Sequence, residues 1–299
     1  MNKIMSMTLL LISPFSFAKM HIIPLQQTAD GHLEIQATIN EVQGTFILDT
    51  GATGTLIDLN QLAKFGLQKN DESMVGIRSG DQDAGTIETF TVEVESFSIN
   101  GHKININSIY ANDTSGQFEP SVVGLIGQDA LTELEALLDL KVPRLLIPDT
   151  PEDLEELLGD SQTPKYETIQ IQRSDMGFSF VDITLNQHEL RLLVDSGASE
   201  TVLDQSVLTQ LGFTLGQHPT AESIVAEGIE LPMTVLRGST IHLGKAQLKG
   251  DFFASDFSAL MQTINQDQQR LFVGVLGNKQ LVELNSIVDL SKRKLYIKP

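Results

Sequence analysis

The sequence contains two copies of one unit. Residues 39–67 align without a gap on residues 185–213, and residues 124–147 align on residues 274–297. Identical pairs in these blocks include Asn40/Asn186, Asp49/Asp195, Gly51/Gly197, Ala52/Ala198, Thr55/Thr201, Asp58/Asp204, Leu62/Leu208, Gly66/Gly212, Gly124/Gly274, Gly127/Gly277 and Asp139/Asp289. Two copies are too few for a stacked repeat protein. The duplication therefore predicts two similar lobes that pair with each other.

The junction between the copies has the composition of a linker. Residues 149–165 contain two prolines, one glycine and six acidic residues, which interrupt regular structure and favour solvent. We therefore divide the chain into an N-terminal lobe (19–148), an acidic linker (149–165) and a C-terminal lobe (166–299). A short surface helix within the linker is the second interpretation, because it contains Leu154, Leu157 and Leu158.

The hydrophobic pattern of each copy predicts mainly β-structure. Apolar residues alternate with polar ones at Phe90, Val92 and Val94, and residues 178–185 look similar. Short helices are predicted between a capping aspartate and a glycine, at Asp58–Gly66 and at Asp204–Gly212. A second pair of helices is predicted at Ala130–Ala136 and Gln280–Leu284. The expected fold class is all-β with minor helix.

Each copy contains the triplet Asp-Thr/Ser-Gly directly after an apolar strand. The two segments read Phe46-Ile47-Leu48-Asp49-Thr50-Gly51-Ala52 and Leu192-Leu193-Val194-Asp195-Ser196-Gly197-Ala198. One such triplet alone is usually a plain turn. Here both lie at the same register of the repeat, and two apolar residues and a glycine follow each of them later in its copy. These later segments are Leu125-Ile126-Gly127 and Val275-Leu276-Gly277.

Together these motifs resemble those of the pepsin/retropepsin clan of aspartic proteases. Asp49-Thr50-Gly51-Ala52 matches the clan's active-site loop in its retroviral form, and Asp195-Ser196-Gly197-Ala198 matches the serine variant. The segments that end at Gly127 and Gly277 match the second clan element, which packs against the loop. The resemblance covers about residues 20–299. It implies a bilobal, single-chain pepsin/retropepsin-like fold with two pseudo-twofold-related, β-barrel-like lobes and a few short helices.

The resemblance also implies the chemistry of an aspartic endopeptidase. Asp49 and Asp195 would meet between the lobes and share one proton, because two adjacent carboxylates do not both ionise cheaply. The ionised partner would activate a water, and the protonated one would donate to the scissile carbonyl. The titration belongs to the pair, so neither aspartate is assigned as the base. No metal or cofactor is expected.

The neighbouring residues have supporting roles by the same resemblance. The Thr50 and Ser196 hydroxyls would tie the two loops together. Gly51 and Gly197 would allow a backbone conformation and a close approach that a Cβ would obstruct. Ile126-Gly127 and Leu276-Gly277 would support the loops from behind. Pepsin-type enzymes usually have Ser or Thr where this chain has Ala52 and Ala198. Losing that hydroxyl removes a donor to the carboxylate, so we expect a mildly acidic optimum.

Glycine-rich stretches are candidates for the flaps that cover substrate in this clan. They are residues 74–90 in the first copy and 220–235 in the second, and an ordinary surface hairpin is the alternative for each. Neither contains the flap tyrosine of pepsins. We favour the first copy's hairpin as the dominant flap. After the later glycines the copies differ, with Gln128-Asp129 in one and Asn278-Lys279 in the other.

The first 18 residues have the pattern of a signal peptide. A basic Lys3 precedes an uncharged stretch from Met5 to Phe17, and Ser16-Phe17-Ala18 suits a cleavage site. The stretch is shorter than the roughly 20 residues of a membrane span. A retained anchor or a buried first strand is the alternative. The chain has no cysteine, which fits a bacterial periplasmic or secreted protein better than a eukaryotic secreted one.

Charge and duplication together limit the partners we expect. The formal charge of −19 disfavours binding to nucleic acid. A polypeptide substrate is expected, without stable membrane insertion after leader cleavage. Since one chain supplies both halves of the site, a monomer is the simplest assembly. Either a maturation protease or a general degradative one fits the sequence. The main alternative is a non-catalytic peptide-binding or scaffold protein on the same fold.

Overall fold

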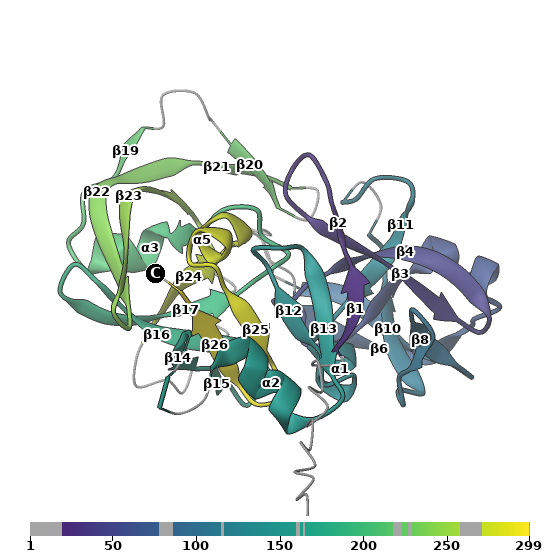
Figure 1. Cartoon of the computed structure of the whole chain (residues 1–299). Helices are drawn as coiled ribbons and strands as arrows, with labels where there is room; N and C mark the ends of the chain where they lie inside the picture. The colour runs from purple at the N-terminus through teal and green to yellow at the C-terminus, as the bar shows by residue number, and fades with distance from the viewer. Residues whose placement is uncertain are drawn as a thin grey trace, which may run out of the picture.

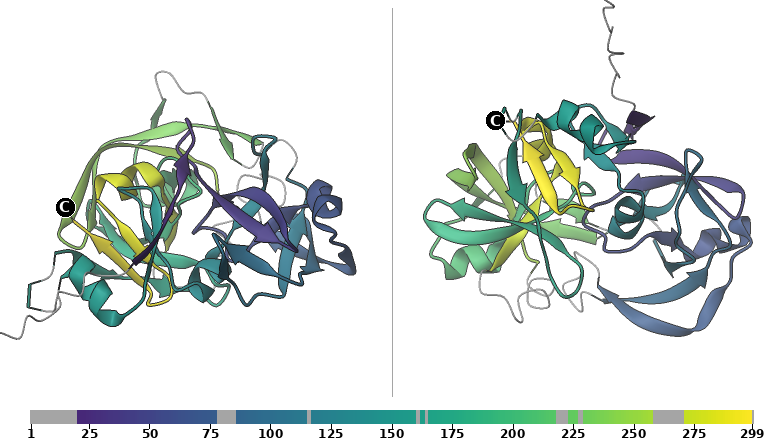
Figure 2. Two further views of the ribbon diagram at one scale, coloured as in Figure 1. Left: turned by 45° about the vertical axis from the view of Figure 1, so that its right-hand side comes forward. Right: turned by 60° about the horizontal axis from the view of Figure 1, so that its bottom comes forward.

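Two lobes make up the computed structural model, which describes residues 20–77, 86–114, 117–159, 162–163, 165–217, 223–226, 229–257 and 271–298. The expected leader, residues 1–18, lies outside the described residues. In Figure 1 the first part of the chain, purple to blue, forms the lobe on the right. The later part, green to yellow, forms the lobe on the left, and the same division is visible in both views of Figure 2.

The first lobe is built on a ten-stranded sheet in the order β6-β7-β10-β5-β11-β4-β3-β8-β9, with β2 paired to β3. Its strands are β2 (Gln26–Gln27), β3 (Leu33–Ile39), β4 (Val42–Leu48), β5 (Leu56–Asp58), β6 (Lys69–Ile77), β7 (Thr86–Glu93), β8 (Phe97–Ile99), β9 (His102–Lys103), β10 (Ser108–Asn112) and β11 (Val122–Ile126). Strand β11 runs parallel to β4 and antiparallel to β5. It therefore lies between the strands on either side of the first Asp-Thr-Gly loop.

The second lobe repeats this arrangement in an eight-stranded sheet, in the order β15-β16-β17-β24-β18-β23-β22-β19. Its strands are β15 (Gln172–Arg173), β16 (Ser179–Leu185), β17 (His188–Val194), β18 (Val202–Asp204), β19 (Gly216–Gln217), β22 (Thr234–Leu243), β23 (Ala246–Ser255) and β24 (Phe272–Leu276). Strand β24 runs parallel to β17 and antiparallel to β18. The duplication seen in the sequence is thus a duplication of topology.

A third sheet joins the two copies. It has six strands in the order β1-β13-β12-β25-β26-β14, namely β1 (Met20–Pro24), β13 (Arg144–Pro148), β12 (Leu137–Asp139), β25 (Ile287–Asp289), β26 (Lys294–Ile297) and β14 (Glu167–Gln170). The copies meet where β12 pairs antiparallel with β25, with Leu138 opposite Val288. Because both copies contribute strands, this sheet connects the two lobes.

The segment between the copies contains helix α2 (Pro151–Leu158), so the helical interpretation of the linker is the one that the structure adopts. The Thr150 hydroxyl accepts from the Asp153 N–H, and the Asp153 carboxylate accepts from the Thr150 N–H, which forms a capping box. Helix α2 lies beside the shared sheet (Figure 1), and its leucines pack against side chains of that sheet. This cluster comprises Leu137, Leu146, Leu158, Ile287 and Tyr296, with Leu154, Leu157, Met20 and Tyr166 packed against it.

The predicted capped helices are present in both copies. The first, η1 (Leu59–Phe65), is a 3-10 helix capped by Asp58 and ended by Gly66 at φ 65°. The second, α3 (Gln205–Gln210), is capped by Asp204, and Gly212 follows it at φ 82°. Both glycines adopt the left-handed conformation that ends many helices. No helix among the described residues is long and apolar enough to cross a membrane.

The second pair of helices differs in its bounds from the prediction. Helix α1 spans Gln128–Glu133 and α5 spans Asn278–Glu283, so each begins two residues earlier than expected. Their caps are the motif glycines, with extended backbone. Glu135 and Asn285 adopt positive φ angles of 51° and 47°, which is why the helices stop short of the predicted ends. Gln128 and Asn278 consequently lie in the first turn, against the loops.

Candidate active site

Asp49 and Asp195 lie at the ends of equivalent strands. Asp49 follows β4 and Asp195 follows β17. In each copy the aspartate N–H donates to a carbonyl of the adjacent parallel strand, at 3.0 Å to Ile126 and 3.2 Å to Leu276. These two acceptors belong to the second motif of each copy. The apolar strands therefore deliver both aspartates to the same place relative to their supporting motif, as the duplication predicts.

The two carboxyl groups meet between the lobes. A methyl group added at Gly51 would lie 2.7 Å from the Asp195 carboxyl carbon, and one at Gly197 would lie 2.6 Å from the Asp49 carboxyl carbon. Each carboxyl group thus occupies the space that a side chain on the opposite glycine would fill. The two aspartates also share a side-chain hydrogen bond. Gly51 and Gly197 are therefore required for space. Neither has a positive φ angle, so the expected need for a special backbone conformation is wrong.

The surroundings favour one proton on the pair. Burial of its carboxyl group, the charge of Asp49 and the hydrogen bond between them raise the pKa of Asp195 well above its usual value. The N–H groups of Gly197 and Ala198 donate to its Oδ1 at 2.9 and 3.1 Å and oppose this rise. Desolvation and like charge dominate, so Asp195 favours its neutral form at a pH where an isolated aspartate is ionised.

The first copy provides the same backbone donors to its own aspartate. The N–H groups of Gly51 and Ala52 donate to Asp49 Oδ1 at 2.7 and 3.2 Å. In both copies one carboxylate oxygen therefore points into its own loop. Both aspartates retain partial solvent exposure. A water molecule or a polypeptide can approach such a pair, which a fully enclosed pair would not permit.

Thr50 and Ser196 connect the loops symmetrically. The Thr50 N–H donates to Ser196 Oγ at 3.0 Å, and the Ser196 N–H donates to Thr50 Oγ1 at 2.9 Å. Each hydroxyl then donates across the boundary, Thr50 Oγ1 to the Val194 carbonyl at 2.9 Å and Ser196 Oγ to the Leu48 carbonyl at 3.0 Å. Both residues are fully buried. The cross-connection expected from the resemblance is therefore present in the geometry.

The second motifs pack directly behind the loops. A methyl group at Gly127 would lie 2.4 Å from the Gly54 carbonyl carbon, and one at Gly277 would lie 2.3 Å from the Glu200 carbonyl oxygen. The N–H of Gly127 donates to Thr55 Oγ1 at 3.2 Å, and that of Gly277 donates to Thr201 Oγ1 at 3.1 Å. Only glycine fits this approach of two backbones. Ile126 and Leu276 are fully buried beside them.

Several residues at the site have no signature in the sequence. Thr55 and Thr201 are an identical pair of the repeat, but their pattern does not indicate that they hold the motif glycines. The sequence alone also assigns no role to the difference between Gln128-Asp129 and Asn278-Lys279. Asp129 Oδ1 accepts from Thr55 Oγ1 at 2.7 Å, whereas Lys279 forms an ion pair with Glu200 at 2.8 Å.

The candidate flaps are partly described. Strands β6 and β7 pair antiparallel up to Ile77 opposite Thr86, and the tip between them, with Gly80 and Gly85, lies outside the described residues. In the second copy β20 (Ser223–Ala226) pairs with β21 (Ile229–Pro232). Both stretches are thus hairpins. Val75 on β6 is 74% exposed, an apolar surface available to an approaching chain.

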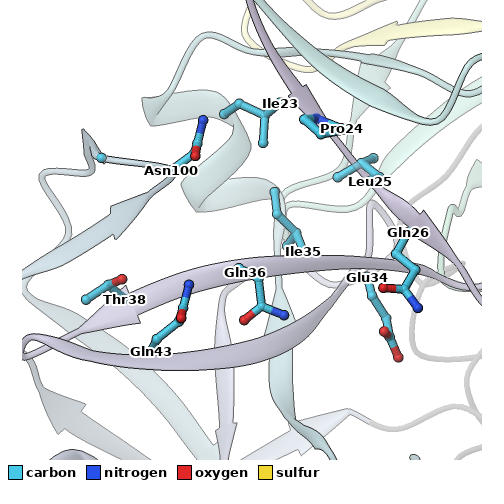
Figure 3. A pocket seen from close by; sticks show the side chains of 11 residues that line it. Ile23, Pro24, Leu25, Gln26, Glu34, Ile35, Gln36, Thr38, Gln43 and Asn100 are labelled. Carbon is cyan, nitrogen blue, oxygen red and sulfur yellow. The ribbon is translucent and has the colours of Figure 1, made fainter.

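A pocket of about 600 Å³ lies elsewhere, on the first lobe (Figure 3). Strand β1, strand β3 and the segment after β8 line it, with Ile23, Glu34, Gln36 and Asn100 among its residues. None of its lining residues belongs to the two motifs. It is therefore not the candidate active site, which is a junction between lobes. Within the described residues, no cluster of His, Asp or Glu could hold a metal ion.

The comparisons with known proteins agree with this geometry. A family model described as aspartyl protease matches residues 35–130 and 181–278, one match in each copy. A comparison with curated proteins found no match. Among solved structures, the chain is similar to basic 7S globulin from soybean, with a TM-score of 0.53 and 12% identity over 94% of this chain and 95% of that one. This likeness concerns the fold and confirms the predicted bilobal all-β class.

Proposed function

The chain belongs to the aspartyl protease family, and from this premise we propose that it is an aspartic endopeptidase with Asp49 and Asp195 as its catalytic dyad. One observation carries the proposal. The two carboxyl groups are in hydrogen-bond contact, and the pKa of Asp195 is raised by burial and by the Asp49 charge. A pair that shares one proton contains the general base and the general acid that amide hydrolysis needs.

In the proposed reaction the nucleophile is a water molecule between the two carboxyl groups. The ionised carboxylate takes a proton from this water as its oxygen bonds to the scissile carbonyl carbon. The protonated carboxyl group donates its proton to the carbonyl oxygen, which gives a neutral tetrahedral diol. As that intermediate collapses, the newly protonated carboxyl group donates its proton to the amide nitrogen, and the ionised carboxylate takes a proton from one hydroxyl of the diol. The C–N bond breaks, which releases an amine and a carboxylic acid. The shared proton is thereby restored.

Peptide cleavage by single variants tests the proposal. Asp49→Asn and Asp195→Asn each remove one ionisable partner, so we expect cleavage of a peptide library to disappear in both. Asp58→Asn is the matched control, because asparagine caps a helix about as well as aspartate and Asp58 caps η1. The wild type and Asp58→Asn should cleave equally. If wild type and Asp49→Asn behave alike with every peptide, the enzymatic proposal fails.

The same experiment separates the alternative function. A peptide-binding or scaffold protein would retain peptides without cleaving them, and the dyad variants would bind as the wild type does. Both aspartates and both connecting hydroxyls are retained, which supports the catalytic proposal. A library profile would also distinguish a maturation protease with few targets from a degradative one, because the former would cleave few sequences.

We further propose that the protein works outside the bacterial cytoplasm as a monomer. The leader pattern of residues 1–18 supports secretion. The absence of cysteine favours a bacterial periplasmic or secreted protein over a eukaryotic secreted one. A shared sheet that already contains strands from both copies supports the monomer. Cell fractionation and N-terminal sequencing of the mature protein test the location and the expected cut before Lys19, and sedimentation tests the assembly.

A further inference from the structure

Gln128 and Asn278 occupy the same place in the two copies. Each is the first residue of the helix that follows the motif glycine, and each is almost completely buried, at 1% and 3% exposure. A buried amide is costly unless it is hydrogen-bonded. The backbone N–H of each residue also donates to its own loop, to Ala52 at 3.0 Å and to Ala198 at 2.8 Å. Their side chains therefore lie directly behind the dyad.

Both side-chain amides donate to the carbonyl of the residue that follows the aspartate. Gln128 Nε2 donates to the Thr50 carbonyl at 2.9 Å, and Asn278 Nδ2 donates to the Ser196 carbonyl at 2.9 Å. Two different residue types thus perform the same contact. The shorter asparagine and the longer glutamine both reach it.

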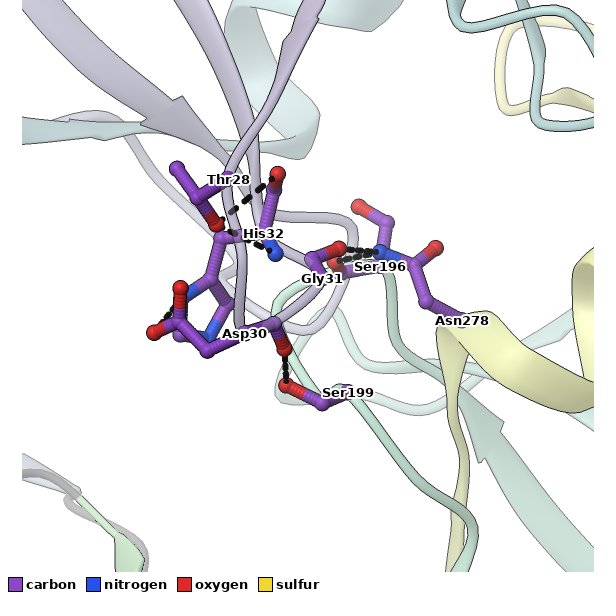
Figure 4. A network of polar contacts seen from close by, with 7 residues as sticks. All are labelled: Thr28, Asp30, Gly31, His32, Ser196, Ser199 and Asn278. Atoms are coloured by element: carbon purple, nitrogen blue, oxygen red, sulfur yellow. Dashed lines mark hydrogen bonds and ion pairs between the residues drawn. The ribbon is translucent and has the colours of Figure 1, made fainter.

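Each amide also contacts the opposite copy. Gln128 Oε1 accepts from Ser179 Oγ at 2.6 Å, and Ser179 begins β16 of the second copy. Asn278 Nδ2 donates to the Gly31 carbonyl at 3.0 Å, and Gly31 precedes β3 of the first copy (Figure 4). The loop around Gly31 is further fixed by Ser199 Oγ, which donates to the Asp30 carbonyl. The contacts cross the lobe boundary in opposite directions.

The carbonyls that these amides hold belong to the peptide groups that serve the carboxylates. The Thr50 carbonyl and the Gly51 N–H are parts of one planar peptide group, and that N–H donates to Asp49 Oδ1 at 2.7 Å. In the second copy the Gly197 N–H, in the peptide group with the Ser196 carbonyl, donates to Asp195 Oδ1 at 2.9 Å. Because the peptide is rigid, a donor on its oxygen fixes the direction of its N–H. Such a chain of hydrogen bonds also polarises the N–H.

We propose that Gln128 and Asn278 are positioning residues that hold the peptide groups after Asp49 and Asp195 and link each to the opposite lobe. This proposal rests on the proposed function of the dyad. Neither side chain contacts substrate in this proposal. Each acts through the peptide group that donates a hydrogen bond to the aspartate of the same copy. The two copies differ at the amide oxygen. Gln128 Oε1 accepts from Ser179 Oγ, whereas Asn278 Oδ1 has no hydrogen-bond partner among the described residues.

Carboxyl NMR of the folded protein tests the proposal without depending on peptidase activity. With aspartate ¹³C-labelled at the carboxyl carbon, Asp49→Asn and Asp195→Asn identify the dyad signals. Gln128→Met removes the amide at similar length. We expect the lower apparent pKa of the dyad to rise by about half a unit or more, since the ionised form loses a well-directed donor. Asn278→Leu should raise the same apparent pKa. It replaces Gln128→Met in the measurement if Gln128→Met does not fold.

Two further variants separate positioning from packing. Gln128→Asn should retain the wild-type titration, because Asn278 demonstrates that asparagine reaches the equivalent carbonyl. Ser179→Ala removes the cross-lobe hydroxyl but leaves the Thr50 contact, so the dyad titration should stay while the urea midpoint falls. In cleavage assays Gln128→Met should lower kcat about tenfold with little change in KM. A dyad titration unchanged in both Gln128→Met and Asn278→Leu would overturn the proposal. A wild type that cleaves nothing would refute only the peptidase proposal.

Discussion

Thr50 and Ser196 donate to each other's hydroxyl oxygen from their backbone N–H groups, at 3.0 and 2.9 Å, across the boundary between the two copies. The hydroxyls in turn donate to carbonyls of the opposite strands. The relative position of the two Asp-Thr/Ser-Gly loops is therefore set by buried, uncharged hydrogen bonds. These bonds do not change with pH, unlike the carboxyl pair beside them.

Removing the Thr50 hydroxyl should destabilise the whole molecule. Thr50→Val keeps the shape but deletes the donor to Val194 and leaves the buried Ser196 N–H without its acceptor. An unsatisfied buried group costs about 1–3 kcal/mol, so we expect a loss of unfolding free energy of that size in urea. Thr50→Ser, which keeps the hydroxyl and matches the second copy, should lose much less. Equal losses for valine and serine would assign the effect to the methyl group instead.

A single methyl group on Gly197 should disable the dyad. Its carbon would lie 2.6 Å from the Asp49 carboxyl carbon, far inside van der Waals contact, so the carboxyl group must move. Misplacing a reacting group by about 1 Å costs roughly 100-fold in rate, and we expect at least that loss of kcat/KM in Gly197→Ala.

Gly212→Ala is the control for that substitution. Gly212 has φ 82° and open space around it, so alanine there costs about 1–2 kcal/mol of stability through backbone strain without moving the dyad. Folded Gly212→Ala should keep its activity. If Gly197→Ala and Gly212→Ala lose stability alike and both retain activity, the carboxyl group is not confined as the structure indicates.

The two aspartates could be singled out from the sequence because duplication places each at the end of an equivalent apolar strand, followed by an equivalent glycine motif. The resemblance to aspartic proteases then implies that they meet. The shared sheet could not be predicted. Residues 137–139 and 287–289 form strands that pair with each other across the copies, and the sequence does not predict this pairing. The pairing depends on how the lobes dock, which no local pattern encodes.

The contacts of Gln128 and Asn278 could not be predicted from the sequence for a related reason. Their cross-lobe partners, Ser179 and Gly31, are not equivalent residues of the repeat. The side chains themselves also differ, so an alignment of the copies presents them as a departure. Only the positions of the backbone carbonyls, which have no sequence signature, reveal that the two amides do the same thing.

Peptide cleavage should have a bell-shaped pH dependence with a mildly acidic optimum. As pH rises through the raised pKa of Asp195, the pair loses its shared proton and activity falls. As pH falls, the second carboxyl group is protonated and the base is lost. Ala52 and Ala198 supply no hydroxyl to stabilise the ionised form, which moves the acidic limb upward. The pH profile of kcat/KM measures both limbs, and an optimum near about pH 2, as for a pepsin-type dyad, would contradict this expectation.

Asp195→Asn should stabilise the protein at neutral pH and not at low pH. The pKa of Asp195 is raised in the folded protein, so the native state binds the proton more tightly than the unfolded chain does. The contribution of Asp195 to the free energy of unfolding is therefore fully present below its unfolded pKa of about 4. This contribution is lost as pH rises through its higher pKa in the folded protein. Asparagine is neutral throughout and avoids that loss. The melting temperatures of the wild type and Asp195→Asn should thus be similar at about pH 3, and that of the variant should be higher at about pH 7. Exposed Asp175→Asn removes one negative charge from the same acidic chain and should give a smaller gain. An equal gain would mean that net charge, rather than the Asp49–Asp195 pair, governs the change.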